Sequence, residues 1–183
     1  MNPRRLAPLI RLRFALTSRS RAAAGIARDA ARYESLAADL SAGAGARPIF
    51  VPAMVGVDED MRRWSYWMLL AHNAIVNRGI TAVTVALAEG REPDGAALID
   101  PKRDVLPGPE VGPEQLDVFR DSVAGHLAAV AGLDRLRGTA TRPHPLFGDF
   151  DAHKWHCMFG FHLKVHMKQA HLVARGAREA RPD

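Results

Sequence analysis

The sequence contains little cysteine and no long apolar run. Cys157 is the single cysteine among 183 residues, so an intramolecular disulfide is excluded and a reducing, cytoplasmic environment is expected. We expect this thiol to be buried and structural rather than a nucleophile. No stretch approaches the roughly 20 apolar residues of a membrane span, so no transmembrane segment is expected. Residues 6–16 make a poor signal-peptide core because Pro8, Arg11 and Arg13 interrupt them, which leaves an interfacial amphipathic helix over residues 9–16 as an alternative.

The net positive charge is confined to the first 32 residues. The net charge is +5, but residues 1–32 hold eight arginines and one aspartate, so they carry +7 and the rest of the chain carries −2. A DNA-reading domain has a basic face on its folded body, so nucleic acid is not the expected partner. We predict residues 1–20 to be a basic N-terminal arm or short helix. The apolar fraction of 48% predicts one globular domain after it.

Strand signals are also nearly absent, and helical periodicity replaces them. Only residues 49–51 form a β-like run, which is too short to support a sheet. Apolar residues recur at three- and four-residue steps over 21–40, about 58–89, 113–137 and from 149 or 151 to about 175. Residues 91–112, rich in proline and glycine, predict a long irregular connection, and 142–148 predict a proline-constrained turn. The expected fold is therefore all-α, with a helical domain at 21–176 and a tail at 177–183.

Two histidines stand four residues apart in the last predicted helix. His162 and His166 share one face and fall on an apolar stripe with Trp155 and Gln169, so both are predicted to point inward. His72 occupies the same kind of position on the second helix, eight residues after Trp64. Three inward histidines on two helices predict a metal triad in the core of a helical bundle. Hydrogen-bonded core histidines are the alternative interpretation.

Three neutral imidazoles suit zinc, nickel, iron or copper and leave a coordination position open for chemistry. Gln169 follows His166 by three residues, so it is predicted to orient a ligand histidine or a bound water. Trp64 and Trp155 are predicted to wall the pocket, and His126 on the third helix is predicted to reach it.

Several short motifs together resemble a known family. Trp64-Ser65 followed by His72, then His162-x-x-x-His166-x-x-Gln169, with His144-Pro-Leu-Phe-Gly148 before the last helix, is similar to the DinB-like superfamily. The resemblance implies a four-helix bundle with a long crossover connection and a divalent metal, commonly zinc, nickel or iron. It also implies kinship with thiol-dependent enzymes that use bacillithiol, mycothiol or glutathione. The chain departs from the commonest pattern because Val165, rather than a second histidine, precedes His166.

These observations lead to three hypotheses. The first is a metal-dependent enzyme in which His72, His162 and His166 hold one ion that activates a low-molecular-weight thiol or water, as in an S-transferase or hydrolase acting on a small-molecule substrate. The second is a non-catalytic metal-binding bundle that works by association, such as homodimer formation. The third, nucleic-acid binding through residues 1–32, is the least favoured.

Overall fold

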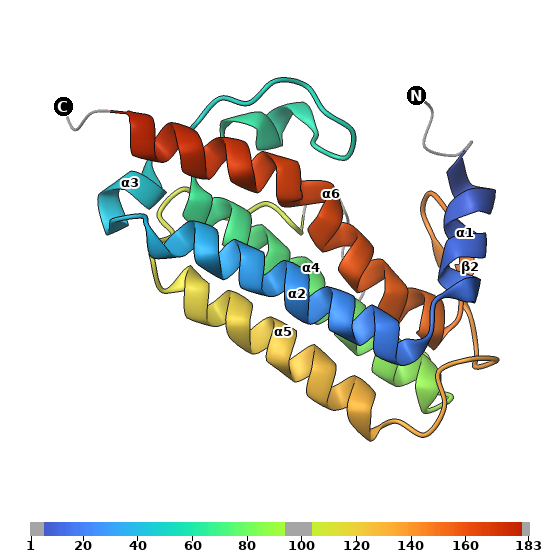
Figure 1. The fold of residues 1–183 in the computed structure, drawn as a ribbon. Helices are drawn as coiled ribbons and strands as arrows, with labels where there is room; N and C mark the ends of the chain where they lie inside the picture. Colours follow the sequence, from blue (N-terminus) through green and yellow to red (C-terminus); the bar gives the residue numbers. More distant parts are fainter. Residues whose placement is uncertain (1–5, 94–103, 181–183) are drawn as a thin grey trace.

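The protein is mostly helical, as the sequence predicts. The computed structural model describes residues 6–93 and 104–180, and its only sheet within them is a two-stranded hairpin (Figure 1). In chain order the elements are α1 (Ala7–Leu16), α2 (Arg19–Ala38), α3 (Ala42–Ala46), the 3-10 helix η2 (Glu59–Arg63), α4 (Tyr66–Ala88), α5 (Gln115–Gly132), β1 (Arg142–His144), β2 (Gly148–Phe150) and α6 (Ala152–Glu179).

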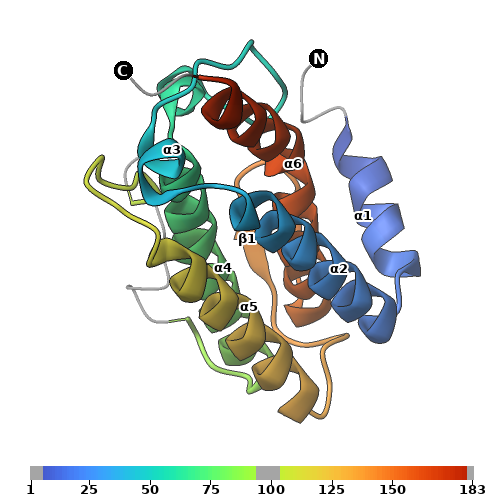
Figure 2. The same cartoon turned by 60° about the vertical axis from the view of Figure 1, so that its left-hand side comes forward.

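Four long helices form the body of the molecule. α4 contacts α5 and α6, and α2 contacts α6 and α5, so these four helices lie side by side (Figures 1 and 2). The shorter α1 packs against α6. α6 therefore contacts α2 and α4 on one side and α1 on another.

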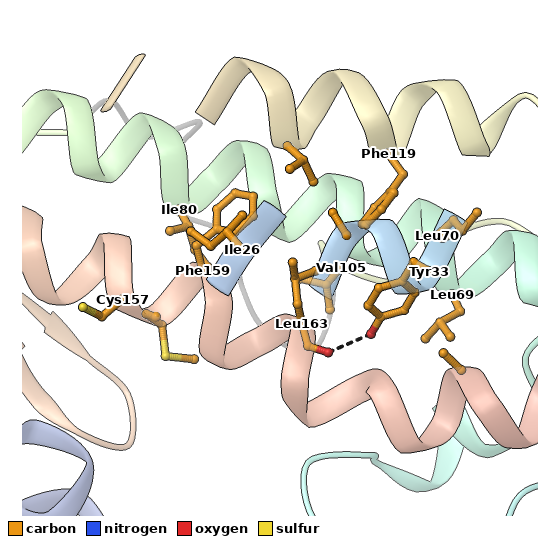
Figure 3. Close-up of a cluster of buried hydrophobic side chains, with 14 of the residues drawn as sticks. Ile26, Tyr33, Leu69, Leu70, Ile80, Val105, Phe119, Cys157, Phe159 and Leu163 are labelled. Atoms are coloured by element: carbon orange, nitrogen blue, oxygen red, sulfur yellow. Dashed lines mark hydrogen bonds between the residues drawn. The ribbon is translucent and has the colours of Figure 1, made fainter. Parts of the chain in front are cut away.

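The core lies where α2, α4, α5 and α6 meet. Tyr33 of α2 and Phe119 of α5 contact each other with ring centroids 5.4 Å apart and planes tilted by 52°, and both are fully buried (Figure 3). The hydroxyl of Tyr33 donates a hydrogen bond to the Leu163 carbonyl of α6 at 2.8 Å (Figure 3). A buried phenol needs such a partner, so this bond fixes α2 against the middle of α6.

The start of α4 differs from the prediction. Residues 58–60 were expected to begin this helix, but they lead into η2, and Trp64 then adopts an extended conformation with ψ of 151°. α4 begins after Ser65, whose side chain accepts a hydrogen bond from the Met68 amide. A serine cap satisfies one free amide of a first helical turn, which the acidic residues do not do here. Trp64 therefore lies just outside α4, and the prediction that it belongs to this helix is wrong.

The last helix is longer than predicted. Asp151 caps it by accepting a hydrogen bond from the Lys154 amide at 3.0 Å, in agreement with one of the two predicted caps. α6 then continues to Glu179, so residues 177–179 belong to the helix rather than to a separate tail. Among the described residues, no helix is both long and apolar enough to cross a membrane.

The proline-rich turn before α6 is a β-hairpin. β1 and β2 pair antiparallel with Pro143 opposite Asp149, which corrects the prediction that the chain has no strand. Each strand has three residues, so alternation was too short to be detected. Gly148 closes the turn with φ of 76°, a conformation that glycine adopts without a steric penalty.

α5 ends earlier than predicted, at Gly132 rather than near residue 137. The Arg19 guanidinium of α2 donates hydrogen bonds to the carbonyls of Val130, in the last turn of α5, and of Leu133, which follows the helix. The end of α5 is thus fixed by a side chain from another helix. Of the predicted irregular connection at 91–112, residues 94–103 lie outside the described residues.

Candidate metal centre

The structure brings the three predicted histidines together. His72 of α4 and His162 and His166 of α6 each offer a ring nitrogen within 4.8 Å of the others. The ring centroids of His162 and His166 lie 4.7 Å apart, and those of His72 lie 5.2 and 4.8 Å from them. This arrangement follows from the four-residue spacing, which places both α6 histidines on the face that contacts α4.

Two of these histidines are oriented by partners behind the cluster. Nδ1 of His72 lies 2.9 Å from the Val105 carbonyl oxygen, and Nδ1 of His166 lies 2.9 Å from Oε1 of Gln169. The amide of Gln169 is itself oriented, because its Nε2 donates to the Met61 carbonyl at 2.8 Å. Both partners of the histidines can only accept, so Nδ1 carries the proton in each ring and Nε2 keeps its lone pair. Outer contacts of this kind are typical of metal-ligating histidines.

Two ring nitrogens at the cluster lack hydrogen-bond partners. Nε2 of His72 and Nδ1 of His162 are buried and have no hydrogen-bond partner in the described part of the chain. A buried polar atom left unpaired costs about 1 to 3 kcal/mol, so such atoms indicate a bound group. His72 and His166 are 2% and 3% exposed, while His162 is partly exposed and forms the side of the cluster nearest the surface. The donor set therefore fits a divalent cation.

The environment keeps the three imidazoles neutral. Burial, together with the nearby His166, lowers the pKa of His72 to about 4. Burial also lowers the pKa of His162, which lies near His166, His72 and His144. The pKa of His166 is lowered by burial and raised in part by Gln169 and Asp58. All three are therefore unprotonated at neutral pH, the form that binds a metal.

The predicted pocket residues divide into two groups. Trp64 lies against the cluster, with its ring centroid 5.0 Å from that of His72. Trp155 instead packs against His144 and Phe150, at 5.4 and 5.8 Å. Because His144 lies close enough to His162 to affect its pKa, Trp155 is one side chain removed from the cluster.

His126 does not join the triad. Its Nε2 lies 2.9 Å from Nδ1 of His156 and its Nδ1 lies 2.9 Å from the hydroxyl of Thr81, while its ring stacks on Phe159. The prediction that it reaches the metal pocket is corrected, because both of its ring nitrogens contact Thr81 and His156 rather than the triad. His126 belongs to a second group of buried histidines.

This second group forms a hydrogen-bonded chain across four helices. His156 continues it, with Nε2 3.3 Å from the Arg19 carbonyl oxygen of α2. The Thr81 hydroxyl has one proton and donates it to the Asn77 carbonyl at 2.7 Å, so the contacts of this chain compete for protons. Both rings are neutral at neutral pH, because burial lowers the pKa of His126 to about 3 and that of His156 to about 4. The chain thus links α4, α5, α6 and α2.

Sequence reasoning missed this chain, although a signal was present. His126 shares a helical face with Phe119, Val123 and Val130, all of them buried. That periodicity indicates an inward histidine, but it does not identify the residue opposite. The pairing with His156 depends on how α5 and α6 are both placed by α2 and α4.

Cys157 is buried next to His153, with its sulfur 3.6 Å from Nε2 of that ring. The same nitrogen lies 3.1 and 2.9 Å from the carbonyl oxygens of Phe14 and Thr17, so its proton is directed at the main chain. Burial raises the pKa of the thiol to about 12. Cys157 is therefore protonated at neutral pH and is a poor nucleophile.

Comparison with family models, curated proteins and solved structures found no match. The similarity of the short motifs to the DinB-like superfamily therefore stays a prediction. Interpretation of the site rests on its own geometry.

Proposed function

We propose that His72, His162 and His166 hold one divalent ion, either zinc, nickel or iron, and that the protein is a metal-dependent enzyme of the S-transferase or hydrolase type. The observation that carries this proposal is the geometry of the cluster: three neutral imidazoles converge, and Val105 and Gln169 hold the outer nitrogens of His72 and His166. Three protein ligands leave a position for a substrate or water, as is typical of catalytic rather than structural sites.

The bound ion would act as a Lewis acid that lowers the pKa of a low-molecular-weight thiol or of water. The chain's own residues supply orientation. Val105 and Gln169 fix which nitrogen of His72 and His166 faces the site, and Trp64 covers one side of His72. Nε2 of His72 and Nδ1 of His162 are buried from solvent. The choice of a thiol follows from the resemblance to the DinB-like superfamily.

The same proposal includes a DinB-like four-helix bundle with a crossover connection. It is supported by the contacts among α2, α4, α5 and α6. The connection between α4 and α5 contributes directly to the centre, because Val105 lies within it and accepts the hydrogen bond from His72. A crossover that carries a contact to a ligand histidine couples the site to the fold.

A non-catalytic metal-binding bundle that acts through oligomerisation or partner binding is the second candidate. The deep burial of His72 and His166 favours it, since structural metal sites are closed. Metal removal separates the candidates. A structural site predicts unfolding without metal and four protein ligands, whereas a catalytic site predicts retained helicity and an exchangeable fourth ligand.

Elemental analysis of the protein purified without a histidine tag tests the metal site. We expect about one divalent ion per chain, by analogy with three-histidine centres, and its loss in the His162→Ala/His166→Ala variant. His171→Ala is the matched control, because His171 is exposed on the same helix. Metal absent from the wild type even after divalent ions are offered, or retained in the double variant, would overturn the assignment.

A further inference from the structure

α1 presents leucines to solvent on its outer face. Leu9, Leu12 and Leu16 are 64%, 56% and 73% exposed and follow one another at three- and four-residue steps. The opposite face buries Ile10 and Phe14. An exposed apolar face on a helix whose other face is buried is typical of a surface that contacts a membrane or another protein.

The rest of α1 is firmly attached to the protein. Phe14 packs edge-on against Phe150 and Phe161, with ring centroids 5.7 and 5.9 Å away. The Arg11 guanidinium donates hydrogen bonds to the Phe147 and Asp149 carbonyls at 3.0 and 3.2 Å. These contacts hold α1 in one orientation, so the exposure of its leucines is a property of the folded protein.

Basic residues outnumber acidic ones in α1 and α2. Residues 6–32 contain six arginines, one aspartate and no lysine or glutamate. Arg13 is exposed on α1 itself. Two other arginines lie next to exposed apolar residues in the segment before α4, where Arg62 and Arg63 stack over Phe50 at 4.5 and 5.4 Å. Exposed leucines bordered by arginines are complementary to a surface that is apolar inside and anionic outside.

The 50–57 segment contributes to the same side of the molecule. In both views it lies, with α1, on the side of α6 that faces away from α5 (Figures 1 and 2). Its Phe50 and Val55 are 58% and 68% exposed. Two separate elements therefore expose apolar side chains to solvent.

We propose that the α1 leucine face, Leu9, Leu12 and Leu16 with Arg13, docks the protein on an anionic lipid bilayer. α1 lies parallel to the membrane, inserts its leucines at the level of the headgroups and places arginine near lipid phosphates. A second copy of the chain fits less well, because an isologous contact brings two arginine-rich segments together. Three leucines also form a much smaller patch than the roughly 800 Å² that each partner of a stable dimer buries.

Vesicle cosedimentation of the full chain tests this proposal. The probes are vesicles of phosphatidylcholine alone and of phosphatidylcholine with phosphatidylserine. We expect binding only to the anionic vesicles at about 0.1 M salt and its loss near 1 M, where the Debye length falls from about 10 to about 3 Å. The Leu9→Ser/Leu12→Ser/Leu16→Ser variant should lower the partition coefficient at least about tenfold.

Leu106→Ser is the matched control, since Leu106 is 40% exposed outside α1. It should bind vesicles as the wild type does. If circular dichroism shows that the triple variant is misfolded, the single variants Leu12→Ser and Arg13→Gln are measured in its place, and each should lower the partition coefficient.

Equal binding to neutral vesicles, or unchanged binding of these folded variants, would refute membrane docking. A wild-type dimer that the leucine changes convert to monomer without vesicles would assign the face to self-association instead. Metal content is measured in the same samples, so that a failure of membrane binding can be distinguished from a failure of the proposed metal site.

Discussion

Replacing Gln169 with leucine tests whether contacts behind His166 prepare it to bind a metal. Gln169 is fully buried, accepts a hydrogen bond from Nδ1 of His166 at 2.9 Å and donates one to the Met61 carbonyl at 2.8 Å. Leucine keeps most of the bulk and removes both bonds. Such outer contacts contribute about 10- to 100-fold to metal affinity, so Gln169→Leu should weaken binding by about 1.4 to 2.7 kcal/mol.

The same change should also destabilise the metal-free protein. It leaves the His166 N–H and the Met61 carbonyl buried without partners, each at a cost of about 1 to 3 kcal/mol. The free energy of unfolding in urea should fall by about 2 to 4 kcal/mol, within the range of a small buried hydrogen-bond network. Metal affinity must therefore be measured by chelator competition at a temperature where the variant is folded.

Two controls separate positioning from packing. Gln169→Glu keeps an acceptor for His166, so it should retain more metal affinity than Gln169→Leu even though it no longer donates to Met61. Lys168→Leu changes the exposed neighbour and should alter neither quantity. Unchanged metal affinity in a destabilised Gln169→Leu protein would refute the reasoning, because Gln169 would then support packing alone.

Three further experiments test the surrounding structure. His126→Phe should lower the free energy of unfolding by about 1 to 3 kcal/mol in urea and leave metal content unchanged, because it removes the partner of His156. The pKa values of His126 and His156, about 3 and about 4, lie below the ordinary value near 6.5. The stabilisation by the neutral pair is therefore complete above pH 6.5 and decreases as pH falls toward 4. A variant whose unfolding free energy depends on pH as strongly as that of the wild type would contradict the hydrogen bond between these two histidines. Cys157 should react with a thiol reagent only after denaturation, because the native thiol is buried with a pKa of about 12, and rapid native labelling would disprove that. Ser65→Ala should cost about 1 kcal/mol of stability by removing the cap from the Met68 amide, and an unchanged unfolding midpoint would argue against that cap.

Helical periodicity accounts for the part of the site that the sequence predicts. A four-residue spacing necessarily places His162 and His166 on one face, and the apolar residues around them show that this face points inward. The same reasoning places His72 inward on α4. Periodicity identifies faces of helices, which is why the three members of the triad could be named before their distances were known.

Contacts between elements follow from packing, which periodicity does not describe. His126 is inward, as its stripe indicates, but its partner is His156 because α5 and α6 both pack against α2 and α4. The contact from His72 to Val105 is equally invisible, since a backbone carbonyl in an irregular connection has no residue-type signal. Trp64 was assigned to a helix because acidic residues precede it, whereas the cap at Ser65 determines the actual start of α4.

X-ray absorption spectroscopy of the zinc-loaded protein tests the metal centre most directly. The account predicts three imidazole nitrogens at about 2.0 to 2.1 Å and one light, non-protein ligand that a thiol or an anion replaces. His72→Ala should reduce the number of imidazole ligands to two. A shell dominated by carboxylate oxygens, or three imidazoles that persist in His72→Ala, would contradict the assignment of His72, His162 and His166 as the metal ligands.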